Sequence, residues 1–161
     1  MLVARAQLDL VRSFLAEFAG PTSDMRSIAL LRAQYVAVVV TLRSVGHVLL
    51  KVDADTPAKE RWLKARWDAW KVEPIFADFI EPGRNVLLKE ARGLLDFSDA
   101  SVSSPAVVTD PVMPDMVSLL VDFDAAAHRT NRRPTLELFR EAVQFWDTRV
   151  REAEQAFPNL N

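Results

Sequence analysis

Apolar residues recur at spacings of three and four along most of this chain, which is the period of an α-helix with one buried face. The pattern predicts a first helix over residues 3–19, ended by Gly20-Pro21. A second helix follows the capping residues at 22–24 and ends at 53–55. It is apolar on nearly every side, which is typical of the central helix of a bundle.

Proline and its neighbours mark the boundaries of the later helices. Thr56-Pro57 predicts the start of a third helix, and Glu73-Pro74 predicts a break followed by a short helical piece. Residues 81–83, Glu-Pro-Gly, predict a tight turn, after which another helix begins at Arg84. The expected core face of that helix comprises Leu87, Ala91, Leu94 and Leu95.

The last third of the chain changes in composition before it returns to helical patterning. Residues 98–113 are rich in Ser, Asp, Val and Pro, and predict a long loop or a short β-hairpin. A helix is expected from Pro114 to about residue 129, and a last one from Pro134 to Phe157. The predicted fold is therefore one all-α domain over residues 1–161, an up-and-down bundle of five to six helices.

The amino-acid composition excludes several kinds of site and of catalysis. The 161 residues are 50% apolar and 26% charged, which suits one globular domain. The absence of cysteine excludes disulfides, thiolate metal sites and thiol catalysis, and it is compatible with the cytoplasm, where we expect the protein to act. The net charge of −2 gives no overall basic field for nucleic acid, although a local basic patch is compatible with it.

We expect neither a signal peptide nor a membrane span. Arg5 and Asp9 interrupt the first residues too early for the apolar region of a signal peptide. The most apolar stretch covers residues 28–52, but a membrane span tolerates almost no charge. Four ionisable side chains lie inside that stretch: Arg32, Arg43, His47 and Lys51. It is better interpreted as a core helix.

The segment 81–90, Glu-Pro-Gly-Arg-Asn-Val-Leu-Leu-Lys-Glu, carries the most informative polar residues. A turn at 81–83 would place Arg84 and Asn85 in the first turn of a helix, with Lys89 one turn further on. Arg84 and Lys89 would then lie near one face and reach a common anion. The free N–H groups of a helix start would strengthen that site.

Arg84-Asn85, followed by three variable residues, resembles the motif of the HEPN domains. These are small helical bundles, many of them ribonuclease toxins or antiviral effectors. The resemblance covers the helix order over residues 26–97 and, more loosely, the last helix. It implies an RNA-associated domain of toxin–antitoxin or phage-defence type, with Arg84 steadying a phosphate and an antitoxin or other protein as partner.

The sixth position of the motif departs from the family. Lys89 stands where the family has the histidine that acts on the 2′-hydroxyl of RNA. Lysine has a reference pKa of about 10.4 and is a poor base at neutral pH unless it is desolvated. The chain is therefore either a ribonuclease with Lys89 in an unusual setting or a catalytically degenerate relative.

The central helix carries a second group of polar residues. Arg43 and His47 are four residues apart and face the same way. If this helix packs against the one with Arg84, they would complete a cluster with Arg84 and Lys89. Alternatively, His47 is a hydrogen-bonded side chain that pins two helices together. The small Gly46 between them suits a close helix approach. The candidate catalytic set is Arg84, Asn85, Lys89 and His47, and Arg43 is a candidate phosphate ligand.

Two further clusters lie late in the chain. Arg129, Arg132 and Arg133 form a basic group that either binds phosphate or is a solvated helix end. Asp124 and His128 are four apart on the expected fifth helix, but two ligands do not make a metal site. We predict no metal and no cofactor.

Four tryptophans support an alternative function. They occupy positions 62, 67, 70 and 146, and Trp62 cannot share one helical stripe with both Trp67 and Trp70. One of them is therefore expected to face outward as an interface anchor. The alternative to an RNA-associated domain is a non-enzymatic helical homodimer that binds a protein partner through this tryptophan face.

Overall fold

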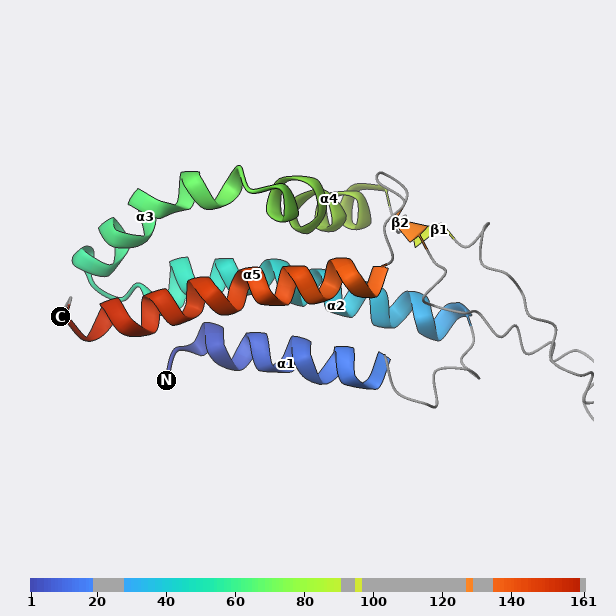
Figure 1. Cartoon of the computed structure of the whole chain (residues 1–161), viewed down its shortest axis with the longest axis horizontal. Coiled ribbons are helices and arrows are strands. Elements are labelled where there is room, and N and C mark those ends of the chain that lie inside the picture. Colours follow the sequence, from blue (N-terminus) through green and yellow to red (C-terminus); the bar gives the residue numbers. More distant parts are fainter. Residues whose placement is uncertain (19–27, 91–94, 97–126, 129–134, 160–161) are drawn as a thin grey trace, which may run out of the picture.

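The computed structural model describes residues 1–18, 28–90, 95–96, 127–128 and 135–159. It confirms the all-α bundle (Figure 1). The α-helices are α1 (Val3–Phe18), α2 (Ile28–Val48), α3 (Pro57–Lys71), α4 (Glu81–Glu90) and α5 (Thr135–Ala156). Two π-helical segments, η2 (Leu49–Asp53) and η3 (Ile75–Ile80), and a 3₁₀ turn, η5 (Phe157–Asn159), extend or connect them.

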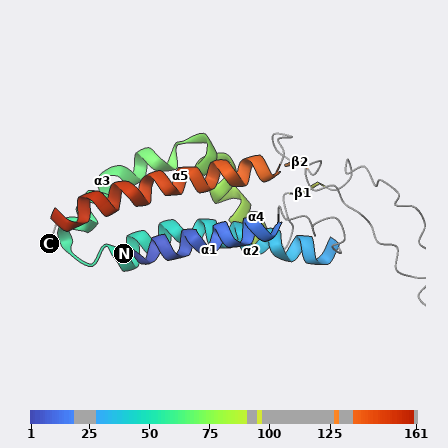
Figure 2. The same ribbon diagram turned by 60° about the horizontal axis from the view of Figure 1, so that its bottom comes forward.

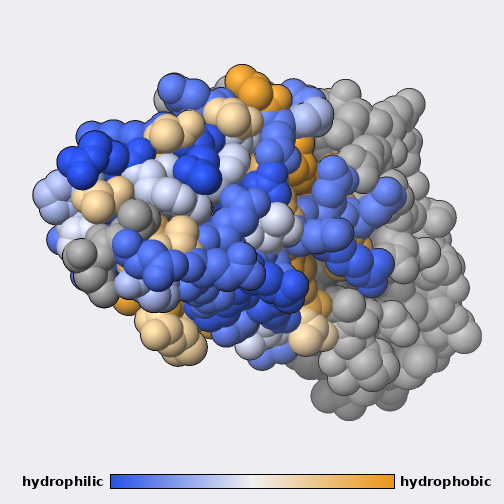
Figure 3. Space-filling view, turned by 60° about the vertical axis from the view of Figure 1, so that its left-hand side comes forward, coloured by the Kyte–Doolittle hydropathy of each residue, from blue (hydrophilic) through white to orange (hydrophobic). Residues whose placement is uncertain are grey.

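The helices form two sides around the central pair α2 and α5. In Figure 1, α1 lies on one side of this pair, while α3 and α4 follow one another along the other; in the turned view of Figure 2, α1 runs along α2. The start of α1 and the turn η5 lie at the same end of the bundle (Figure 1). That end presents a mainly hydrophilic surface with isolated apolar residues (Figure 3).

The predicted turn at residues 81–83 is wrong. Pro82 and Gly83 lie inside α4, which follows the π-segment η3 directly. The Glu81 N–H donates to the Phe76 carbonyl five residues back, so the helix continues through this point. Proline is tolerated here because it stands in the first turn of an α-helix, where an N–H is dispensable, and the wider π-turn before it absorbs the change in geometry.

A short antiparallel pair joins β1 (Leu95–Asp96) to β2 (Ala127–His128). It corrects the helical assignments of Leu95 and His128. Leu95 is in a strand, not on the core face of a helix, and His128 is not four residues along a helix from Asp124. Such pairing is long-range, so local periodicity does not report it. The expected loop at 98–113 and most of the expected helix from Pro114 lie outside the described residues.

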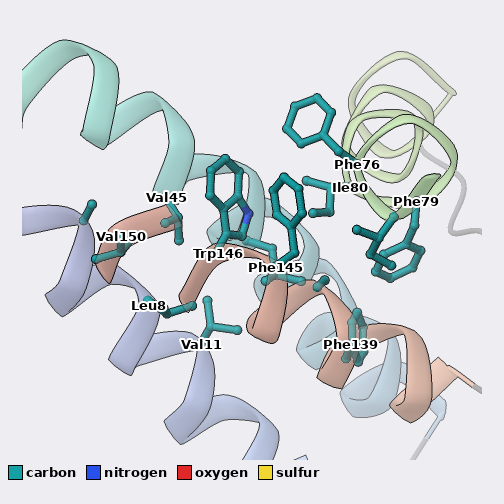
Figure 4. Packing of buried hydrophobic residues seen from close by; sticks show 14 of the residues in the cluster. Leu8, Val11, Val45, Phe76, Phe79, Ile80, Phe139, Phe145, Trp146 and Val150 are labelled. Carbon is teal, nitrogen blue, oxygen red and sulfur yellow. The ribbon is translucent and has the colours of Figure 1, made fainter. Parts of the chain in front are cut away.

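Aromatic side chains fill the centre of the bundle. Trp146 and Phe145 of α5 point toward α2 and η3, with Phe76 and Ile80 facing them (Figure 4). The Trp146 and Phe76 rings meet edge to face, with centroids 6.0 Å apart. Trp67 of α3 stacks on Trp146 at 6.3 Å. These pairs join three separate elements into one core, since each ring buries a large apolar area.

Gly46 allows the Trp146 ring to lie directly against the backbone of α2. A Cβ atom at Gly46 would stand 2.3 Å from Cη2 of Trp146 and 2.8 Å from Cη2 of Trp67. Both distances are far below van der Waals contact, so any side chain at this position would displace the rings. The small residue predicted to allow close packing at Gly46 therefore makes room for two tryptophan rings.

No tryptophan faces outward. Trp70 and Trp146 are buried, and Trp62 and Trp67 are half-buried. Trp62 packs edge to face on Phe157 at 5.7 Å, and the Arg66 guanidinium covers its ring at 4.0 Å. Trp62 also meets the Trp70 ring edge to face at 6.4 Å, so it continues the same aromatic cluster, and the C-terminal turn and a neighbouring arginine cover part of its remaining surface. The predicted exposed tryptophan face is wrong.

The start of α1 is fixed by a residue from the end of the central helix. Both carboxylate oxygens of the buried Asp53 accept backbone hydrogen bonds, from the N–H groups of Val3 and Ala4, each at 2.8 Å. A carboxylate in this place satisfies two otherwise unpaired donors and complements the positive end of the helix dipole. The expected end of the second helix at 53–55 therefore doubles as the N-terminal cap of α1.

One helical stretch, Ala33–Asp53, would be long and apolar enough to cross a membrane on length and composition alone. In the bundle its residues Tyr35, Val38 and Leu42 belong to the core. Val36 and Val40 on the opposite side are exposed. The stretch therefore packs as a central helix along one face and carries an apolar strip on the other.

Replacement of Gly46 by alanine tests the close packing. Because the added methyl group overlaps the Trp146 ring, we expect Gly46→Ala to lower the free energy of unfolding by about 2 kcal/mol, although alanine is the better helix former. Urea denaturation followed by circular dichroism measures this.

Trp146→Phe provides the matched background, because phenylalanine lacks the Cη2 and Cζ2 atoms of Trp146 that the methyl group would meet and leaves only the contact with Trp67. In that background the cost of Gly46→Ala should fall below about 1 kcal/mol. An equal cost in both backgrounds would contradict the contact.

Asp147 joins α5 to α1 through a charged network. Its Oδ1 atom lies 2.5 Å from Nη1 of Arg5 and 2.6 Å from Nη2 of Arg12, and its Oδ2 atom lies 2.7 Å from Nη2 of Arg151. Burial disfavours the ionised carboxylate, but hydrogen bonds from Arg5 and Arg12 and the charges of Arg12 and Arg151 outweigh it and hold the pKa of Asp147 below its usual 3.8.

This network should stabilise the protein above the ordinary carboxyl pKa and lose its effect in acid. A lowered folded-state pKa contributes stability that is complete above about pH 4 and disappears as pH falls through the folded pKa. The stability difference between wild type and Asp147→Asn should therefore be constant near neutral pH and shrink below about pH 4. Asp68→Asn, at an exposed residue of α3, is the control and should follow the wild type throughout. A difference that persists unchanged at pH 2.5 would contradict the assignment.

Candidate anion-binding site

The seam between α2 and α4 brings together two of the arginines that the sequence singled out. Arg43 is half-buried in the second half of α2, and Arg84 is exposed in the first turn of α4. The two helices pack against each other, and η3, which leads into α4, also contacts α2. The prediction that Arg43 and Arg84 would come together is supported by this packing and by their electrostatic interaction.

Arg43 rests on an aromatic ring, without an acidic partner in direct contact. Its guanidinium carbon lies 5.5 Å from the centroid of Phe76. Within the part of the chain that the structure describes, its side chain forms no ion pair and no hydrogen bond. A cation over a ring face is attracted by the ring quadrupole, but this leaves the N–H donors of the guanidinium available.

Electrostatics make this position unfavourable for an isolated cation. Burial lowers the pKa of Arg43, the charge of Arg84 lowers it further, and only Glu81 acts in the opposite direction. Since an arginine side chain remains protonated in proteins, the cost appears as an unsatisfied positive charge. An anion placed between Arg43 and Arg84 would relieve it.

Glu81 and Asn85 complete the site on the α4 side. Glu81 is half-buried and stands three residues before Arg84, so the two lie on one face of the helix. Nη1 of Arg84 donates a hydrogen bond to Oδ1 of Asn85 at 3.1 Å. The Arg-Asn pair of the motif is therefore a local contact in which the amide orients the guanidinium.

His47 is exposed one helical turn beyond Arg43. It forms no hydrogen bond or ion pair with any described residue. The interpretation of His47 as a buried side chain that pins two helices is therefore wrong. It lies instead on the same side of α2 as Arg43 and is open to solvent. The close packing on this part of α2 is at Gly46, against the Trp146 ring.

Helix-start N–H groups do not contribute to an anion site at Arg84. That prediction depended on a turn at 81–83, and the continuous helix removes it because the Glu81 N–H is already bonded to the Phe76 carbonyl. The attraction for an anion must therefore come from the charges of Arg43 and Arg84 themselves.

Several predicted residues lie outside what the structure describes. Lys89 is in α4, but its side chain is not described, and neither is that of His128. The basic cluster Arg129, Arg132 and Arg133 lies wholly outside, as does Asp124. In the described ranges, no group of three or more His, Asp or Glu side chains is placed to hold a metal ion.

Sequence reasoning missed Glu81 and Phe76 as parts of the site. Glu81 was assigned to a turn, and Phe76 was not singled out. One feature of the sequence could have indicated Glu81 as part of the site: it stands three residues before Arg84. That spacing places both on one face only if residues 81–84 are helical. Pro82-Gly83 concealed that, since this pair usually marks a turn.

Comparison of the chain with protein-family models, with curated proteins and with solved structures finds no match. The likeness to the HEPN domains therefore rests on the Arg84-Asn85 pattern and the helix order alone.

Proposed function

We propose that this chain is a HEPN-like, RNA-associated domain that binds a backbone phosphate of RNA between Arg43 and Arg84. The observation that carries the proposal is the pair of arginines at the α2–α4 seam, which contact no carboxylate directly in the described structure. Two guanidinium groups from different helices form a rigid, two-sided anion receptor.

Arginine suits phosphate for geometric reasons. Its planar N–H fork matches the oxygens of a phosphate and donates two parallel hydrogen bonds. Phe76 holds the Arg43 guanidinium from one side, and Asn85 holds that of Arg84. Both groups are thus partly pre-organised, which reduces the entropy lost when a ligand binds.

RNA is the ligand that the Arg84-Asn85 motif favours. By its resemblance, the domain would act in a toxin–antitoxin or phage-defence system in the cytoplasm, with an antitoxin as partner. Lys89 replaces the histidine of the motif, so RNA binding is the activity that we propose. If the domain also cleaves RNA, the exposed His47 on the Arg43 side of α2 is the side chain suited to proton transfer near neutral pH.

Neutral replacements of the two arginines test the function. Loss of a charge-assisted hydrogen bond to phosphate costs about 1.5–3 kcal/mol, so Arg43→Gln and Arg84→Gln should each weaken binding of a single-stranded oligoribonucleotide at least about tenfold. Each should also reduce the slope of log affinity against log salt by about 0.7. Fluorescence anisotropy of a labelled oligonucleotide at several salt concentrations gives both quantities.

Arg61→Gln is the matched control. Arg61 is exposed on α3, an element that supplies neither arginine of the site, and its replacement changes the net charge by the same amount. It should leave the affinity within about twofold of the wild type. Equal losses in all three variants would show that the binding is only nonspecific attraction, and unchanged binding in Arg43→Gln and Arg84→Gln would refute the proposed site.

A further inference from the structure

We propose that Glu81 makes the arginine pair selective for the singly charged phosphodiester of an RNA chain over the doubly charged phosphomonoester at a chain end. This inference rests on the proposed function, since it concerns the same site. It assigns Glu81 a role in specificity that the RNA-binding motif does not contain.

The backbone fixes Glu81 next to the residue under Arg43 and on the same helix face as Arg84. Its backbone N–H is bonded to the carbonyl of Phe76, the residue whose ring lies under Arg43. Arg84 follows three residues later on the same face of α4. Glu81 therefore lies where the π-segment η3 passes into α4. Along the chain it stands between Phe76, whose ring lies under Arg43, and Arg84.

Glu81 stands close enough for its charge to act on Arg43 without forming a direct ion pair with it. Across the described residues, its carboxylate forms no ion pair with Arg43 or Arg84, yet its charge opposes the lowering of the Arg43 pKa. It is half-buried, so its charge is less screened than that of a fully exposed carboxylate. Apart from the Nη1 atom of Arg84, which donates to Asn85, the donors of both guanidinium groups are therefore not occupied by Glu81.

The charges of the site fit a monoanion. Among the side chains that the structure describes there, Arg43 and Arg84 contribute two positive charges and Glu81 one negative charge, which leaves one net positive charge. An internal phosphate of RNA carries one negative charge, whereas a phosphomonoester carries about −1.5 to −2 near pH 7. The second charge of the monoester is therefore not matched, and it meets the Glu81 carboxylate.

The size of the effect should depend on the charge of the ligand. The electrostatic work done against Glu81 is proportional to ligand charge, so the fold-change for a dianion is about the square of that for a monoanion. If removing a half-buried charge tightens diester binding about threefold, it should tighten monoester binding about tenfold.

Glu81→Gln tests this selectivity. The probes are a dinucleoside monophosphate, which holds one phosphodiester, and a nucleoside 5′-monophosphate at pH 8, each displacing the labelled oligoribonucleotide. We expect wild type to prefer the diester, and Glu81→Gln to gain about threefold for the diester and about tenfold for the monoester. Asp78→Asn, at an exposed residue of η3, removes the same charge nearby and should alter neither affinity by more than about twofold.

The outcomes separate this inference from the proposed function. An equal gain for both probes, or the same gain in Asp78→Asn, would make Glu81 a background charge and overturn the inference. Weaker binding of both probes in a Glu81→Gln protein whose thermal melting is unchanged would show that Glu81 positions an arginine, which also overturns it. If Arg43→Gln and Arg84→Gln leave RNA binding intact, the proposed function itself has failed, whatever Glu81→Gln does.

Discussion

The contact between the Trp146 ring and the backbone of α2 at Gly46 is the constraint on which the rest of the structure depends. The missing side chain at Gly46 lets the largest residue of α5 lie against α2. Phe76 meets the edge of that ring, and Arg43 in turn lies over Phe76. The position of the Arg43 guanidinium is therefore set by the packing of Trp146 and Phe76 in the middle of the bundle.

The π-segment η3 provides the second half of the site. It fills residues 75–80 between α3 and α4 and carries the helix past Pro82 without a turn. Its four large apolar residues are all buried, so its register is fixed by the core. Glu81 and Arg84 follow on one face of α4, α4 packs on α2, and the charges of both residues act on Arg43. A tight turn at 81–83 would instead have left Arg84 at a free helix end.

The helical pattern of the sequence was sufficient for the architecture and for much of the core. Thr56 caps α3 as expected, with its hydroxyl accepting from the Lys59 N–H, and α5 buries Phe139, Trp146 and Val150 at the predicted spacing. Periodicity reports which face of a helix is apolar, and these features depend on nothing else.

Features that depend on distant residues could not be predicted in this way. Asp53 caps α1 from about fifty positions away, Phe157 covers Trp62, and β1 pairs with β2 across residues outside the described structure. For the site, the sequence singled out Arg43, Arg84 and Asn85, but it could not place Glu81. A proline-glycine pair usually marks a turn, so the sequence pattern points away from a helix at residues 82–83. The helix continues there because Pro82 stands in its first turn, directly after the π-turn of η3.

Whether Arg43 and Arg84 hold the same phosphate is the central question, and a double-mutant cycle on RNA affinity answers it most directly. If both guanidinium groups grip one phosphate, the second replacement should cost less than it does in the wild-type background, with a coupling energy of at least about 0.5 kcal/mol. Strictly additive effects would mean that the two arginines bind independently, and that the α2–α4 seam is not a single anion site.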